Sequence, residues 1–428
     1  MSPPKECNHG GPPPQSVPKS RTNDVGMGKR ALETTKVLEF ASFVSGPYCS
    51  KLLADLGAEV IKIEEPNVGD EARRRGPFPE DTPHLEKSGL FLYLNTNKKG
   101  ITLNPHSITG KKIFLELLKW ADIFIEDKPP KEMEELGFSY PSLREINSGL
   151  IMTSITPFGQ TGPYRDFKAY NLNVIQAAGG GYLTPPGSPN LERQPLKGGG
   201  LFDDYTAGLS AAIATLAAFY YRAKTGLGQH IDVSKQEAEM AYDRVEVDLY
   251  PNANTIASRL IGRSTGTELI RCKNGYVMPM AVVDNQWQNL REFMGNPKWA
   301  EDEKFSKFSG RRKHTAELGR RMGEEMKNAT KEEIYHGGQA KGVPSAMVCS
   351  AADVANCPQY KARRFFVEMK HPEAGNVLFP RGPYVFSQTP WSLQYPAPLL
   401  GQHNEEVYCG LLGYTQKDLL EMRRAGVI

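Results

Sequence analysis

Two adjacent aspartates, Asp203 and Asp204, stand immediately before a segment of strong helical character, Tyr205 to Arg222. A carboxylate beside a helix N-terminus stays ionised at neutral pH, because the helix dipole favours negative charge there. Such a carboxylate can attack a thioester without a general base. The alternative is that one aspartate merely caps the helix, a role worth about 1 kcal/mol, and composition alone favours this cap. No Ser-His-Asp or Cys-His arrangement is evident in the sequence.

Glycine-rich stretches precede the two aspartates. A Gly-Pro loop runs from Phe158 to Pro163, and runs of three glycines lie at 179–181 and 198–200. Glycine lets a backbone approach a ligand closely, and the freed N–H groups can stabilise an oxyanion. We therefore expect a ligand beside these runs, with the oxyanion donors near residue 180 or 199.

The elements that must position these residues form an alternating pattern that begins at about residue 35. The segment Lys36 to Phe40 has strand character, a helix follows the turn Ser45-Gly46-Pro47, and Ala58 to Ile63 is the next strand. A helix at 110–120 and strands at 123–125 and 151–155 continue the alternation. This pattern predicts an α/β fold with a parallel sheet, whose ligands bind at the carboxyl ends of the strands.

The loop after Phe40 contains neither GxGxxG nor GxxxxGK[ST], which disfavours a plain NAD or ATP site. The residues found there, Ser42 to Pro47, open a helix whose free N–H groups could hold an anion. On spacing alone we favour the simpler interpretation, a strand-to-helix turn in which Gly46 provides backbone freedom.

Composition limits the remaining classes of protein. The chain has 428 residues, more than the roughly 250 to 300 that one core usually serves, so at least two domains are expected. A net charge of +3 does not predict nucleic-acid binding. No apolar run is long enough to cross a membrane, and residues 1–30, rich in Pro, Gly and Ser, are predicted to be a disordered leader.

The six cysteines show neither CxxC spacing nor paired histidines at zinc-ligand intervals, so we expect no metal site. Scattered cysteines in a long chain are typical of reduced intracellular thiols. The predicted compartment is the cytoplasm, with an organelle matrix as the alternative.

Several segments, in this order along the chain, resemble the family III CoA-transferases, the group that includes formyl-CoA transferase and carnitine CoA-transferase. The resemblance extends over nearly all of the chain after the leader. Its landmarks are Val37 to Phe40, Ser45-Gly46-Pro47, Leu53 to Glu64, Asn97 to Ile101, Gly159 to Pro163, Gln176-Ala177, Asp204 with Gly208, Lys224 to Gln229, Pro398 to His403 and Leu412 to Tyr414.

This resemblance implies that Asp204 is the nucleophile, with Gly208 completing the family's D-x-x-x-G element. The carboxylate would form a mixed anhydride with the donor acyl group and then an aspartyl-CoA thioester. Coenzyme A thioesters are then substrates, and no permanently bound cofactor is expected. By matching positions, the CoA-contacting residues are Val44, Ser45, Gly46, Asn104 and Lys168, and the pocket wall beside Asp204 consists of Tyr170 and Asn171. For Asn104 and Lys168 an ordinary solvated side chain is an alternative of nearly equal weight.

Departures from the family pattern restrict the substrate. Formyl-CoA transferase-like members carry a glutamine at Val44, an acidic residue at Asn171 and a glycine-rich lid that the segment 260–266 does not reproduce. Oxalate and formate are therefore disfavoured, and an acid with some apolar character suits Val44 better. The basic run Arg73 to Arg75 suggests contact with CoA phosphates or an acidic substrate or, more commonly for such runs, a solvated surface.

Two other functions are retained as alternatives. Racemase-type members of the same fold use a histidine and an aspartate, which correspond here to Tyr170 and Asn171, so the proton relay would lack its histidine. The second is a non-catalytic CoA-binding subunit of a heteromeric transferase, which the presence of Asp204 disfavours.

The resemblance also implies the architecture. It predicts a Rossmann-like large domain over 31–250, a smaller α+β domain over 251–345 and a return to the large domain over 346–428. The segment 251–254 has the composition of a linker. Family members form interlocked homodimers, so we expect a homodimer, with a heteromer as the alternative, and neither nucleic acid nor membrane as a partner.

Overall fold

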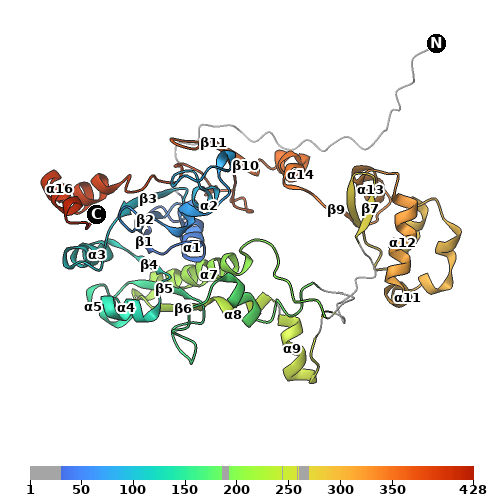
Figure 1. Ribbon diagram of the computed structural model, residues 1–428, viewed down its shortest axis with the longest axis horizontal. Helices are drawn as coiled ribbons and strands as arrows, with labels where there is room; N and C mark the ends of the chain where they lie inside the picture. Colours follow the sequence, from blue (N-terminus) through green and yellow to red (C-terminus); the bar gives the residue numbers. More distant parts are fainter. Residues whose placement is uncertain (1–29, 186–191, 243, 258, 260–268) are drawn as a thin grey trace, which may run out of the picture.

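A six-stranded parallel sheet forms the centre of the protein, as seen in a computed structural model that describes residues 30–185, 192–242, 244–257, 259 and 269–428 (Figure 1). The strand order is β3-β2-β1-β4-β5-β6, the order of a doubly wound Rossmann-type sheet. The strands are β1 (Lys36–Phe40), β2 (Glu59–Glu64), β3 (Lys98–Thr102), β4 (Ile123–Glu126), β5 (Ile151–Thr156) and β6 (His230–Ser234). The predicted α/β class is confirmed.

Helices cover both faces of this sheet (Figure 1). One face packs against a core that includes Phe114, Phe124 and Leu419; its helices are α3 (Ile108–Trp120), α4 (Pro130–Leu136), α5 (Tyr140–Ile146) and α16 (Gln416–Arg424). The other face, which includes Val37, shares a second core with α1 (Ser45–Asp55) and α7 (Phe202–Thr225), to which Ala211 of α7 belongs. Because the strands are covered on both sides, even polar strand residues such as Glu39 and Lys62 are buried, and these two form an ion pair at 2.7 Å.

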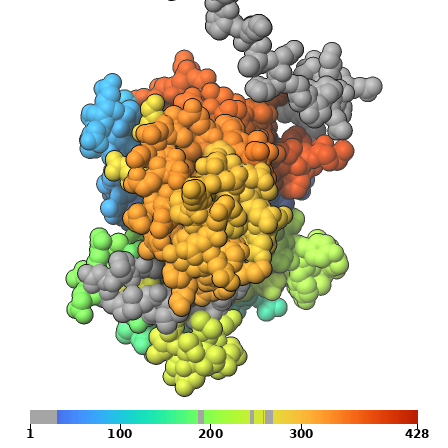
Figure 2. All heavy atoms as spheres, turned by 90° about the vertical axis from the view of Figure 1, so that its right-hand side faces the viewer, coloured from blue at the N-terminus to red at the C-terminus, as the bar shows by residue number. Residues whose placement is uncertain are grey.

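A second group of elements has its own hydrophobic core, which contains Trp287, Phe305 and Met322. It combines an antiparallel sheet of β7 (Ile270–Cys272), β8 (Gly275–Pro279) and β9 (Ser345–Met347) with α10 (Asp284–Phe293), α11 (Phe308–Lys313), α12 (Thr315–Met326) and α13 (Lys331–Ala340). Figure 1 shows this group set apart from the large sheet, and Figure 2 views it face on. This group of helices and antiparallel strands is of the α+β class. The limits of 251–345 for a smaller domain stay a prediction.

The C-terminal segment returns to the edge strand β3. The side chain of Asn404 accepts a hydrogen bond from the Thr102 N–H at 2.9 Å, and the Tyr408 hydroxyl donates to the Thr102 carbonyl at 2.6 Å. Between the two regions lie α14 (Ala351–Asn356), α15 (Pro358–Ala362) and the hairpin of β10 (Phe366–His371) and β11 (Gly375–Pro380); a π-helical turn, Glu406–Leu411, precedes α16.

The remaining helices connect these parts. They are α2 (Gly89–Leu94), α6 (Asn171–Ala177), α8 (Lys235–Tyr242), α9 (Arg244–Ala253) and the short 3-10 turns Glu71–Arg74, Pro79–Asp81, Lys298–Glu301 and Glu303–Phe305. The linker predicted at 251–254 is helical over its first three residues, because α9 continues through Pro251. Among the described residues, no helix has the length and apolar character needed to span a membrane. The predicted leader and the segment 260–266 lie outside the described residues, apart from Arg30.

Candidate active site

Asp204 lies in the first turn of α7, where its side chain is buried. The helix begins at Phe202, and Leu201 occupies the N-cap position without a side-chain cap hydrogen bond. Asp203 and Asp204 are 0% and 2% exposed. The interpretation of either aspartate as the N-cap is therefore wrong, since both lie inside the helix and Asp204 has partners on other elements.

Three side chains from three different elements donate hydrogen bonds to the Asp204 carboxylate. Oδ1 accepts from the Ser45 hydroxyl at 3.1 Å and from the Lys235 ammonium at 2.8 Å. Oδ2 accepts from the Asn171 amide at 3.0 Å. Ser45 begins α1, Asn171 begins α6 and Lys235 begins α8, so three helix starts converge on one carboxylate. Donors fixed in this way hold a charged oxygen without reorganisation.

The glycine of the D-x-x-x-G element permits this convergence. A Cβ at Gly208, one turn after Asp204, would lie 2.6 Å from the Ser45 carbonyl oxygen and 3.2 Å from the Tyr48 ring. Helices α1 and α7 therefore cross at a distance that only glycine allows. That crossing brings Ser45 within hydrogen-bond distance of Asp204.

Asp203 differs from Asp204 in its environment. The Asn171 amide donates to both carboxylates, but Asp203 has no ammonium partner like Lys235 among the described ion pairs. Burial and the neighbouring Asp204 charge raise the pKa of Asp203 to about 6. Asp203 therefore exchanges a proton near neutral pH.

The turn before α1 is shaped by Gly46 and Asp127. A Cβ at Gly46 would lie 2.2 Å from the Ala41 Cβ, so glycine is required here by close packing, whereas the simpler interpretation of this loop attributed Gly46 to backbone freedom. The Asp127 carboxylate accepts the Ser42 N–H at 2.9 Å. Burial raises the pKa of Asp127 to about 6 despite the lowering effect of the Lys128 and Lys235 charges. The side chain of Val44 is fully buried.

The other predicted contact residues lie apart from this cluster. Asn104 lines an open cavity at the carboxyl ends of β1, β2 and β3, together with Ser42, Asp70 and Lys128. Lys168 is exposed and Tyr170, at 74% exposure, precedes α6. The structure thus brings Ser45 and Asn171 to Asp204, places Val44 and Gly46 beside Ser45, and leaves Asn104, Lys168 and Tyr170 outside the hydrogen-bonded group.

The glycine runs differ in position. The N–H groups of Gly179 and Gly181 bond to carbonyls of α6, at Gln176 and Ile175. The run 198–200 immediately precedes α7 and hence Asp204. Of the two predicted sources of oxyanion donors, the second lies nearer to the carboxylate in the chain.

Lys235 was missed by sequence reasoning. It directly follows β6, at the carboxyl edge of the last strand, where ligand-contacting residues of such sheets collect. Applying that rule to the segment His230–Ser234 would have identified it. The prediction used only the strands up to 155.

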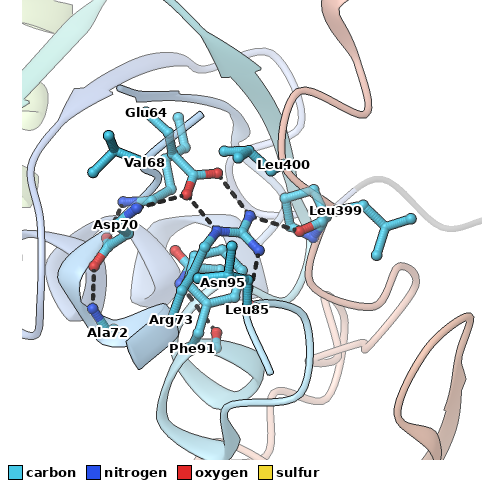
Figure 3. A network of polar contacts seen from close by, with 12 residues as sticks. Glu64, Val68, Asp70, Ala72, Arg73, Leu85, Phe91, Asn95, Leu399 and Leu400 are labelled. Carbon is cyan, nitrogen blue, oxygen red and sulfur yellow. Dashed lines mark hydrogen bonds and ion pairs between the residues drawn. The ribbon is translucent and has the colours of Figure 1, made fainter. Parts of the chain in front are cut away.

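Arg73, predicted to contact CoA phosphates or solvent, does neither. Figure 3 shows its guanidinium enclosed between Glu64 and the C-terminal segment. It bonds to Glu64 at 2.6 and 2.8 Å and to the Pro398 carbonyl at 3.1 Å, and it is 0% exposed. The described residues also contain no group of three or more His, Cys, Asp or Glu side chains that could bind a metal ion.

A doubly wound parallel sheet with a buried carboxylate and converging donors at the edge where such sheets bind ligands defines the protein as an α/β enzyme. The chain belongs to CoA-transferase family III, whose family model matches residues 32–404. It is therefore a transferase, and the family predicted from the sequence landmarks is confirmed.

Individual relatives can be aligned with almost the whole chain. The sequence is 31% identical to a succinyl-CoA–D-citramalate CoA-transferase of Chloroflexus aurantiacus, over 93% of this chain and 98% of the relative. It is 32% identical to a formyl-CoA:oxalate CoA-transferase of Streptomyces coelicolor, over 94% and 100%. A solved CaiB/BaiF family protein from Brucella suis superimposes with a TM-score of 0.80 at 29% identity, covering 89% of this chain and 99% of that one.

Proposed function

We propose that the enzyme moves CoA from an acyl-CoA donor to a carboxylic acid through covalent intermediates on Asp204. The observation that carries this proposal is the buried Asp204 carboxylate, held by Ser45, Asn171 and Lys235 in the first turn of α7. A carboxylate is a nucleophile without deprotonation, so the site needs no general base.

The reaction proceeds in two exchanges. An Asp204 oxygen attacks the thioester carbon, the C–S bond breaks and CoA leaves as a thiolate, forming a mixed anhydride. The thiolate then attacks Cγ of Asp204, breaks the anhydride C–O bond and releases the donor acid as a carboxylate. The acceptor acid reverses both steps. Binding energy from the distant parts of CoA is needed to reach the high-energy anhydride.

The remaining predicted residues have roles that follow from their positions. Val44, Ser45 and Gly46 form the turn along which the pantetheine arm approaches Asp204. Asn104, in the cavity at the carboxyl ends of the strands, contacts the body of CoA, and the exposed Lys168 is positioned for its phosphates. Tyr170 and Asn171 form the acyl pocket wall. CoA thioesters act as substrates, and no resident cofactor takes part.

We infer that the acid has some apolar character. Val44 is apolar where formyl-CoA transferase-like members have glutamine, and Asn171 is uncharged. Relatives of comparable identity act on oxalate in one case and on D-citramalate in the other, so identity alone does not select the acid. An acid with some apolar character suits the replacement of glutamine by Val44 and of an acidic residue by Asn171. We place the enzyme in the cytosol or an organelle matrix.

A homodimer is supported by the outer face of α7. Its inner face buries small residues such as Ala207 and Ala211, whereas large apolar side chains on its other face are exposed: Leu209 at 37%, Ile213 at 61% and Tyr220 at 64%. Exposed apolar patches on a long helix are typical of interfaces. A second copy of this chain, interlocked as the family resemblance implies, is the proposed occupant.

Trapping the intermediate tests the mechanism. Wild-type enzyme is screened with succinyl-CoA, acetyl-CoA and formyl-CoA against a panel of acids, then incubated with the active donor and hydroxylamine. Mass spectrometry should find a hydroxamate on Asp204. Asp204→Ala and Asp204→Asn should fold normally and show no turnover. Racemisation without a hydroxamate would support the isomerase instead, and appreciable transfer by purified Asp204→Ala would refute the covalent mechanism.

A further inference from the structure

Lys235 provides the cation that the structure places against the Asp204 carboxylate. Its ammonium lies 2.8 Å from Oδ1, and the two side chains are only 17% and 3% exposed. The other two donors, the Ser45 hydroxyl and the Asn171 amide, are neutral. Among the described residues, Lys235 is the cation within ion-pair distance of Asp204.

An ion pair with the nucleophile would, by itself, slow the reaction. It stabilises the resting carboxylate, and only interactions that are stronger in the transition state than in the ground state accelerate a chemical step. A lysine at this position is therefore unexplained if its partner is Asp204 alone.

The movement of charge during the proposed reaction explains why a lysine lies beside Asp204. The resting Asp204 carboxylate carries one negative charge, which the Lys235 ammonium balances. When the anhydride forms, Asp204 becomes neutral and the charge moves to the CoA thiolate; when the aspartyl thioester forms, the charge leaves with the donor acid. No proton is transferred at any step. In the thioester state, the Lys235 ammonium has lost its partner in a site that is largely closed to water.

We propose that Lys235 binds the carboxylate of the acceptor acid at this stage, in the position that Asp204 Oδ1 occupies in the resting enzyme. The inference rests on the proposed function. In this proposal Lys235 recognises the carboxylate group, which all acceptor acids share. The side chains of the pocket wall then distinguish one acid from another. Because one anion replaces another on the same ammonium, binding of the acceptor restores the charge balance that formation of the thioester removes.

The position of Lys235 suits this exchange. It is the first residue of α8, directly after β6, and its charge also acts on the buried Asp127 beside the turn that precedes α1. The ammonium and the Ser45 hydroxyl of the turn along which we propose that the donor approaches thus bond to the same oxygen, Asp204 Oδ1. A charge-assisted hydrogen bond to a carboxylate is among the stronger polar contacts in proteins.

The test compares Lys235→Met, which removes the charge but keeps the apolar stem, with Lys235→Gln, which keeps an N–H donor, and Lys235→Arg, which keeps the charge. Lys417→Met is the matched control, because Lys417 pairs with Glu421 at 3.9 Å on α16 and its side chain is 84% exposed. Each protein is assayed with the donor and acid that the wild-type enzyme turns over fastest, and each is checked by thermal unfolding.

We expect Lys235→Met and Lys235→Gln to raise the KM of the acid about tenfold or more, while the KM of the acyl-CoA changes less than about twofold. Lys235→Arg should recover most of the loss, and Lys417→Met should match the wild type. Equal KM values for the acid in wild type and Lys235→Gln would overturn the inference, as would a loss confined to kcat and unfolding temperature. Should Lys235→Met not fold, Lys235→Gln decides the matter. A wild-type enzyme without a hydroxamate on Asp204 would instead refute the proposed function.

Discussion

At the scale of single residues, the two adjacent aspartates have different environments. Asp204 is held by two neutral donors and one ammonium, whereas Asp203 shares only the Asn171 amide with it. Two buried carboxylates side by side repel each other, so the one with fewer partners takes up the proton. This division is consistent with Asp204 as the proposed nucleophile and makes Asp203 a neutral neighbour at mildly acidic pH.

Asp203→Asn should therefore change the pH dependence of stability. The folded pKa of Asp203, about 6, exceeds its ordinary value of 3.8, so the wild type loses stability as pH rises from about 4 through 6. The variant should lack this loss and gain up to about 3 kcal/mol relative to wild type at pH 7. Urea unfolding at pH 4.5 and 7.5 measures the difference.

The turnover of Asp203→Asn should differ from that of Asp204→Asn. Asp203→Asn should retain at least roughly a tenth of wild-type turnover, whereas Asp204→Asn should retain none, because only the second removes the nucleophile. Parallel stability curves for wild type and Asp203→Asn would contradict the assigned pKa.

Glu126 offers a second pH effect, away from the nucleophile. This carboxyl is 0% exposed at the carboxyl end of β4, and burial raises its pKa to about 8 from 4.5. The stability present below pH 4.5 should decline as pH rises through 8, since ionisation must occur in a buried site. Glu126→Gln should unfold at a higher temperature than wild type at about pH 9, with a gain of roughly 1–4 kcal/mol.

The control for Glu126 is Glu135→Gln, whose side chain is 68% exposed on α4. It should leave stability within about 0.5 kcal/mol at every pH, as surface substitutions usually do. If Glu126→Gln gained as much at pH 5 as at pH 9, the effect would come from packing and not from ionisation.

At the scale of elements, the site depends on the crossing of α1 and α7. Gly208→Ala places a Cβ 2.6 Å from the Ser45 carbonyl oxygen, so the helices must separate. Overpacking of this kind costs about 1–3 kcal/mol. Since Ser45 and Asp204 lie on opposite sides of the crossing, turnover should fall at least about tenfold. Urea unfolding and initial rates check both effects.

Gly323→Ala is the matched control, because Gly323 lies within α12 and a Cβ there would meet nothing within 4 Å. It should stabilise the protein slightly, by about 0.5–1 kcal/mol, since alanine is a better helix former. Gly208→Ala with unchanged rate and stability would mean that the crossing does not position the nucleophile.

The sequence predicted those elements whose signals are local. The alternation after residue 35 predicted β1, α1 and β2, and the Asp204-Gly208 spacing could be matched to a family because both residues lie on one helix turn. The contacts of Lys235 could not be predicted in this way, since they depend on β6 lying beside β5 at the sheet edge. Burial likewise escaped prediction, as the buried Val44 and the exposed Tyr170 demonstrate.

At the scale of the whole molecule, the chain leaves the large sheet, builds a second group of elements and comes back (Figure 1). The returning segment is held by specific polar contacts as well as by apolar packing. Asn97 accepts hydrogen bonds from the Gln394 and Tyr395 N–H groups, and Asn404 bonds to Thr102 on β3. These contacts link residues about three hundred positions apart, so no local pattern in the sequence predicted them.

Arg73 joins the returning segment to the end of β2 and to the loop that follows it (Figure 3). Its guanidinium is paired with Glu64 at the end of β2 and with Glu86, donates to the Pro398 carbonyl of the returning segment, and lies 3.7 Å from the centre of the Phe91 ring. Removing one partner of a buried ion pair leaves an uncompensated charge, which costs about 3–5 kcal/mol, far more than the pair contributes when intact.

Arg73→Met should therefore lower the free energy of unfolding by about 3–5 kcal/mol and expose the returning segment to limited proteolysis. Arg73→Met combined with Glu64→Gln should be more stable than Arg73→Met alone, by at least about 1 kcal/mol, because the double variant removes the unpaired charge and retains an acceptor for the Asp70 N–H. Arg75→Met, which breaks an exposed pair with Glu71, should change stability by less than about 1 kcal/mol. Additive losses in the double variant would show that Arg73 stabilises the fold through its packing on Phe91, and that its charge does not hold the returning segment in place.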